Sequence, residues 1–118
     1  MSERTLTVVV VEPMKKPELR EIPNALRAMQ EIVGGYIEAV FPFPEPVALI
    51  CNEEGKLRKM QPNRVLKDPA GNIRDVIVGT FFIAGLGDEA FVSLDDKQVE
   101  RYTEMFRRPQ VLGRAVSV

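Results

Sequence analysis

Histidine and tryptophan are absent from this 118-residue chain, and cysteine occurs once, at Cys51. The lack of histidine removes the commonest general base at neutral pH and the commonest metal ligand. A single cysteine cannot form a disulfide within the chain, and a free cysteine is usually a small buried hydrophobe. Cys51 ends the apolar stretch "VALIC". We therefore expect a buried structural thiol and not a nucleophile.

The motifs of common enzyme chemistry are missing as well. The sequence contains no phosphate-binding loop, no dinucleotide fingerprint and no nucleophile elbow. Some acidic residues could do acid–base work, but all lie beside predicted turns or caps, where acids are common: Glu53, Glu54, Asp88, Glu89, Asp95 and Asp96. We expect no catalytic residue, no metal and no cofactor. A small enzyme acting on a phosphate ester is the less favoured alternative.

Neither a strong net charge nor a long apolar run is present. The net charge is −1, with 45% hydrophobic and 28% charged residues, which are ordinary values for a globular domain. This balance argues against binding of long nucleic acid or of a membrane. The start, "MSERTLTVVVVEP", has no basic segment before its valines, so we interpret it as a strand and not as a signal peptide. We expect one cytoplasmic domain spanning residues 1–118.

Apolar residues at helical spacing predict two helices, at about residues 24–34 and 94–108. Asn24 is the expected N-cap of the first helix. For the second helix, Ser93 and Asp96 have the spacing of a capping box.

Runs of β-branched and aromatic residues predict five to six strands. The run from Thr5 to Val11 has the composition of a central strand, and the stretch from residue 73 to 86 reads as one long strand, bent at Gly79. Short connections between neighbouring strands favour an α+β domain with a mainly antiparallel sheet. Residues 56–72 are expected to form a flexible loop, and residues 109–118 a C-terminal tail.

The segment "KLRKMQPNRVLK", residues 56–67, holds five basic side chains and no acidic one. Such a concentration in a nearly neutral chain predicts an anion-binding site. Arg64 is the first candidate, because a guanidinium can bond two phosphate oxygens and the preceding Pro-Asn pair restricts the backbone. Asn63 could bind the edge of a base, and Arg58 and Lys59 could add charge. The alternative for each residue is a solvated loop or, for Asn63, a turn position.

Four further residues are candidates for ligand binding. Phe81 and Phe82 are adjacent on a predicted strand and so point to opposite faces. Phe82 could stack on a base, unless both faces of the sheet are covered, in which case both rings belong to the core. Arg27, Arg107 and Arg108 lie on or at the end of predicted helices, where solvation and pairing with the helix dipole are the commoner roles.

Five strings occur in a characteristic order: "VVVVEPMKKPELREI", "IVGGYIEAV", "VALICNEEGKL", "PNRVL" and "VGTFFIAG". Together they resemble a family of small proteins from phages and bacterial mobile elements that is catalogued as a domain of unknown function. In size and layout the chain is also similar to the anti-Thoeris nucleotide sponges of phages. That similarity implies a counter-defence protein of the bacterial host cytosol. It would sequester cyclic ADP-ribose isomers, and cyclic oligonucleotides as an anti-CBASS activity, without cleaving them.

Two expectations concern partners. Apolar surface on "VVVV", on "TFFIAG", at Met14 and in the loop from Pro42 to Pro46 predicts a homo-oligomer, either a dimer or a higher multiple. The sponges assemble as oligomers, so the resemblance implies the same, and a hexamer is one order to expect. The small cyclic nucleotide is the expected ligand. The alternative to the sponge is an interaction module that docks on a host protein through its basic segment.

Overall fold

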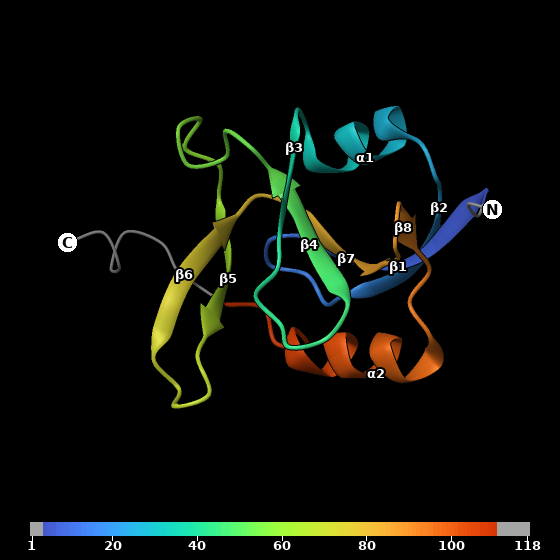
Figure 1. Ribbon diagram of the computed structural model, residues 1–118. Coiled ribbons are helices and arrows are strands. Elements are labelled where there is room, and N and C mark those ends of the chain that lie inside the picture. The colour runs from blue at the N-terminus through green and yellow to red at the C-terminus, as the bar shows by residue number, and fades with distance from the viewer. Residues whose placement is uncertain (1–3, 111–118) are drawn as a thin grey trace.

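The computed structural model describes residues 4–110. Its centre is a six-stranded antiparallel sheet with one helix on each face, and a separate two-stranded hairpin stands beside it (Figure 1). The sheet has the order β2-β1-β7-β4-β3, and β8 also pairs with β7. The bounds of these strands are β1 Thr5–Val11, β2 Glu18–Pro23, β3 Ile37–Val40, β4 Val47–Asn52, β7 Phe81–Leu86 and β8 Phe91–Val92. The hairpin pairs β5 (Pro62–Lys67) with β6 (Ile73–Val78).

The two helices are α1 (Leu26–Val33) and α2 (Asp96–Met105). This architecture confirms the expected α+β class and the antiparallel sheet. Neither of the helices within residues 4–110 is long and apolar enough to cross a membrane.

Both faces of the sheet are covered, which explains why its central strands are continuous apolar runs and do not alternate with polar residues. On one face, Val8 and Val10 of β1 pack with Met29 and Val33 of α1. On the other face, the alternate residues of β1 pack with Tyr102 of α2 and with Phe106. The hairpin joins this second core through Leu66 and Ile77.

The hairpin corrects two expectations. Residues 62–67, expected within a loop, form β5; Pro62 is tolerated there because it begins the strand, next to a bulge between Pro62 and Arg64. The long strand expected from 73 to 86 is two strands in different sheets. Gly79 separates them at φ 72°, and a Cβ there would lie 2.8 Å from Met60 Sδ. Only glycine adopts this turn without strain.

Both helix starts differ from the expected caps. The N-cap of α1 is Ala25, one residue after Asn24, and it makes no side-chain cap. The capping box of α2 is formed by Asp95 and Gln98: Gln98 N donates to Asp95 Oδ1 (2.8 Å), and Asp95 N donates to Gln98 Oε1 (3.0 Å). Ser93 instead accepts a hydrogen bond from Thr7 N (2.9 Å) and ties the chain before α2 to β1. The sequence "SLDDKQ" contains both spacings, and Gln is the better partner at the third helical position.

Replacement of Asp95 by alanine tests this cap. Asp95→Ala should lower the free energy of unfolding by about 1 kcal/mol, because the Gln98 N–H loses its acceptor. Asp96→Ala, at the next position, should change it by about 0.5 kcal/mol or less. Urea denaturation of the two variants and the wild type measures both. A larger loss for Asp96→Ala than for Asp95→Ala would contradict the assignment.

Candidate functional site

Arg64, the leading ligand candidate, is buried with 1% of its surface exposed. Its Nε and Nη2 both donate to Phe106 O, at 3.1 and 3.0 Å, and Nη2 also donates to Lys15 O at 2.6 Å. Its Nη1 donates to Asn63 O (3.2 Å) and to Asn63 Oδ1 (2.7 Å). A guanidinium has five N–H groups, and these five bonds use all of them. In this arrangement no donor of Arg64 remains for a phosphate.

The acceptors explain how a cation is tolerated at this depth. Burial lowers the pKa of Arg64. Every bond that it makes is to a neutral oxygen, and no carboxylate is among its partners in the described part of the chain. Phe106 is the C-cap of α2, so its carbonyl lies at the negative end of the helix dipole. Arg64 therefore serves as an internal cap for the end of α2.

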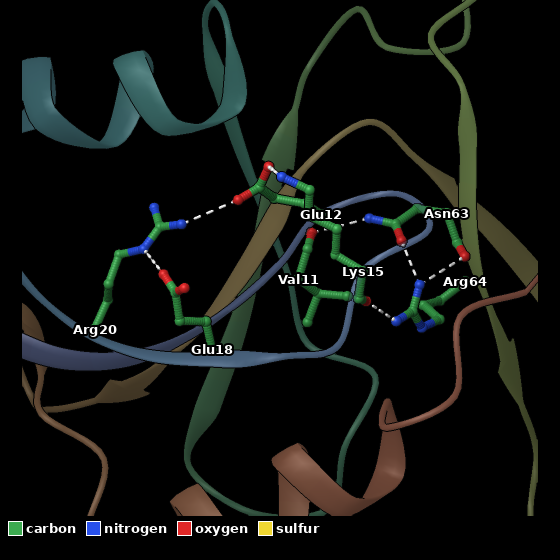
Figure 2. Close-up of polar contacts among 7 residues, drawn as sticks. All are labelled: Val11, Glu12, Lys15, Glu18, Arg20, Asn63 and Arg64. Carbon is green, nitrogen blue, oxygen red and sulfur yellow. Dashed lines mark hydrogen bonds and ion pairs between the residues drawn. The ribbon is translucent and has the colours of Figure 1, made fainter.

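Asn63 is equally unavailable to a ligand. It is fully buried, and its Nδ2 donates to Val11 O (2.9 Å) and to Gly79 O (2.8 Å). Figure 2 shows Asn63 and Arg64 side by side, with their bonds directed to Val11 and Lys15. The pair thus joins the hairpin to the end of β1, to the turn before β7 and to α2. Sequence reasoning found a pre-organised pair here but assigned it to the surface.

Removal of Arg64 should accordingly damage the fold. Arg64→Ala should lower the free energy of unfolding by about 3–5 kcal/mol, because several buried carbonyls lose their donor together. Arg64→Lys should recover only part of the loss, since an ammonium has three donors in a different geometry. Arg74→Ala, a control at an exposed arginine of β6, should stay within about 0.5 kcal/mol of the wild type. Thermal and urea unfolding provide the measurement, and a wild-type stability for Arg64→Ala would contradict this role.

Beside this junction, the segment after β1 carries a charged network (Figure 2). Arg20 donates to Glu18 Oε1 (2.5 Å) and to Glu12 Oε2 (3.0 Å), and Glu12 also pairs with Lys15 (3.6 Å). Glu12 and Arg20 line an open groove of about 410 Å³ against α1, together with Glu31. The carboxylates outnumber the arginine, so this groove does not favour a phosphate.

The remaining candidates are not brought together. Phe82 is fully buried against the α1 layer and Phe81 against the α2 layer, so both rings belong to the core. Arg27 is exposed on α1, and Arg108 is exposed beyond α2. Arg107 pairs with Glu104 across one helical turn (3.1 Å).

Arg58 is the candidate that does lie beside a hollow. The hollow has a volume of about 200 Å³ and is lined by Gln30, Gly35, Tyr36, Glu54 and Arg58. Arg58 Nη1 donates to Gly34 O (2.9 Å), the first residue after α1, which positions the guanidinium over the helix end. Lys59 follows, exposed and in a left-handed conformation (φ 55°). We call this site the Tyr36–Arg58 hollow.

Glycine at position 35 allows the arginine to approach. A Cβ on Gly35 would lie 3.0 Å from Arg58 Nη1 and 2.8 Å from Asn52 Nδ2. Tyr36 comes next, with 66% of its surface exposed. Sequence reasoning missed Tyr36; its position directly after the Gly-Gly end of a helix was the available indication.

Comparison with known proteins gives the chain a family. Residues 6–107 match the family described as "Domain of unknown function (DUF3846)". The chain belongs to this family. No curated protein and no solved structure matches it. Membership confirms the resemblance to a domain of unknown function, and the family name assigns no ligand or activity to the Tyr36–Arg58 hollow.

Cys51 lies in the core on β4 and, as expected, is buried. Burial is the main cause that raises the pKa of its thiol from 9.0 to about 11, and the charges of Glu38 and Asp75 add to it. A thiol that is protonated at neutral pH is a poor nucleophile.

Alkylation tests the state of this thiol. At pH 8, a pKa of about 11 in place of 9.0 makes the thiolate of native Cys51 roughly a hundredfold rarer than in the unfolded chain. Iodoacetamide should therefore modify the native protein at least that much more slowly than the protein in urea. Because the pKa of Cys51 is higher in the folded protein than in the unfolded chain, the free energy of unfolding should fall as the pH rises from 9 towards 11. Equal alkylation rates in the native and unfolded protein would contradict this.

Proposed function

We propose that this protein binds a small nucleotide at the Tyr36–Arg58 hollow, without covalent chemistry, and releases it unchanged. The observation that carries the proposal is an exposed aromatic ring beside a guanidinium that the backbone already holds in place. A nucleotide presents a flat base and a phosphate, which match these two groups. The positioning of Arg58 before binding also reduces the side-chain entropy lost on binding.

Each lining group has a distinct role in this proposal. Tyr36 offers a face on which a base can stack. The Nη1 of Arg58 is bonded to Gly34 O, and its other nitrogens make no hydrogen bond or ion pair in the described part of the chain, which leaves them for a phosphate. The Gln30 amide can donate to or accept from a base edge. The Glu54 carboxylate would repel phosphate but can accept from a ribose hydroxyl or an exocyclic amine, which favours one orientation of the ligand.

The volume limits how much of a ligand this protein can enclose alone. Sites for drug-sized molecules measure roughly 300–1,000 Å³, whereas the hollow measures about 200 Å³. It can hold a base and an adjacent phosphate, and the rest of a larger ligand would project from it. A second protomer could cover that part, which links this proposal to the predicted self-association. Of the surfaces that motivated that prediction, β1 and β7 are buried by the helix layers, whereas Met14 and the prolines of the loop from Pro42 to Pro46 are exposed.

Cyclic ADP-ribose isomers and cyclic oligonucleotides are the first ligands to test. The resemblance to the phage sponges implies them, and each contains at least one base and two phosphates. Capture of such an immune signal would make this a counter-defence protein. The competing proposal of a docking module receives support from a different surface, described below.

Titration calorimetry against these cyclic nucleotides tests the proposal. Tyr36→Ala should weaken binding by about 1–3 kcal/mol through lost stacking, or roughly fivefold to more than a hundredfold. Arg58→Ala should cost about 1.5–3 kcal/mol through the lost charged hydrogen bond. Arg74→Ala removes the same charge from the exposed face of β6 and should bind as the wild type does. After heat release, chromatography should recover the ligand intact.

Three outcomes would contradict the proposal. If the wild-type protein binds none of these nucleotides, the proposal loses its basis. Equal binding by wild type, Tyr36→Ala and Arg58→Ala places the site elsewhere. Recovery of a cleaved nucleotide would identify an enzyme instead.

A further inference from the structure

An apolar groove lies between the proline-rich loop, β5 and the end of α2. Its volume is about 430 Å³, and Phe43, Val65, Leu66, Met105 and Phe106 line it. Met105 is 50% exposed. Phe41, two residues before the lining Phe43, is 60% exposed. This groove is separate from the Tyr36–Arg58 hollow, with which it shares no lining residue.

One wall of the groove is held in place by a carboxylate. Glu45 in the proline-rich loop accepts from Tyr102 Oη (2.5 Å) and from Gln98 Nε2 (3.2 Å), and it pairs with Arg101. All three partners belong to α2, so Glu45 ties the loop to the helix. On the opposite side, Leu66 is anchored in the core. A preformed groove loses little entropy when a ligand enters it.

The groove lies beside β5. β5 pairs only with β6 among residues 4–110. On β5, Val65 N donates to Oε1 of the Gln110 side chain at 2.9 Å. The chain after α2 runs across to β5 (Figure 1), which brings Gln110 to this strand. The Gln110 amide oxygen thus occupies the place that a backbone carbonyl of a neighbouring strand would take.

Two basic residues at or near the groove make no ion pair among residues 4–110. Lys67 lines it and is exposed. Arg108 is exposed two residues beyond the lining Phe106. Asp68, the acidic lining residue, is engaged by the backbone N–H groups of Ala70 (3.0 Å) and Asn72 (2.9 Å). An occupant with apolar side chains and carboxylates complements this surface.

We propose that β5 accepts an extended segment of a partner protein as an added strand, with apolar side chains in the groove and acidic residues against Lys67 and Arg108. Strand addition draws its affinity from main-chain hydrogen bonds and its specificity from pockets for alternate side chains. Val65 N–H supplies the main-chain donor, and the groove supplies the pockets. Gln110 occupies the donor until the segment displaces it.

The test begins with a displayed library of random short peptides selected on the wild-type protein. Enriched sequences should alternate apolar residues and carry Asp or Glu. Binding of one enriched peptide is then measured by fluorescence anisotropy. Val65→Pro removes the N–H at an edge position that tolerates proline, and it should weaken binding about threefold to tenfold. Gln110→Ala removes the competing acceptor and should strengthen binding by a similar factor.

Charge-reversal variants distinguish this groove from general attraction. Lys67→Glu should weaken binding, and its effect should shrink at high salt. Lys97→Glu, the matched control on the first turn of α2, should leave binding unchanged. In the wild type, the Val65 amide should be among the most shifted NMR resonances on peptide addition, which remains informative if Val65→Pro fails to fold.

Several results would overturn the proposal. These are a library that yields no enriched peptide, equal binding to wild type and Lys67→Glu, or an unshifted Val65 amide. Concentration-dependent dimerisation that Lys67→Glu abolishes, without any selected peptide, would assign the groove to a second copy of this chain. Nucleotide binding at the hollow should be unaffected by Lys67→Glu, so this proposal and the proposed function fail independently.

Discussion

The buried guanidinium of Arg64 is the constraint on which the arrangement of this protein depends. Three of its five hydrogen bonds connect β5 with the segment after β1 and with the end of α2, and the other two go to the neighbouring Asn63. Asn63 adds bonds to the end of β1 and to the turn at Gly79. Apart from these polar links, the hairpin contributes Leu66 and Ile77 to the core. The polar junction therefore fixes the direction of the hairpin, which apolar packing alone would restrain less.

This junction also determines the surface on which docking is proposed. Arg64 holds Phe106 O, so the chain after α2 must pass next to β5, and Gln110 reaches Val65 N. Glu45 fixes the opposite wall through Tyr102, and hydrogen bonding to the Tyr102 hydroxyl is the main cause that lowers the pKa of Glu45. Two buried or half-buried polar contacts thus shape an apolar groove. A preformed groove of this kind suits recognition, because binding needs no refolding of its walls.

The basic segment at residues 56–67 does not act as one positive surface. Lys56 pairs with Asp75 (2.5 Å), Arg58 bonds to the carbonyl that follows α1, and Arg64 is internal. Lys67 remains at the rim of the groove. Within this segment, a turn closed by a hydrogen bond from Met60 N to Gly55 O is followed by strand β5. The basic side chains therefore point in different directions. The number of basic residues in this segment therefore overestimated the positive charge that one ligand could contact.

Much of the architecture was predictable from the sequence. The continuous valine run of β1 indicated burial on both faces, and the spacing of apolar residues located both helices, because local periodicity reports which side of an element meets the core. The burial of Cys51 followed in the same way. The family resemblance likewise depended on strings that can be read along the chain.

Only the tertiary structure decided what Asn63, Arg64 and Phe82 do. A polar pair after proline has the same local pattern whether it faces solvent or a set of buried carbonyls. Its acceptors, Val11 O, Lys15 O and Phe106 O, come from positions far apart in the sequence. Likewise, Phe82 on a strand is a stacking platform or a core residue according to whether a helix covers its face. The sequence by itself determined which elements form and which of their residues are apolar. Long-range packing decided which charges are buried and which, at Arg58 and Lys67, remain for a partner.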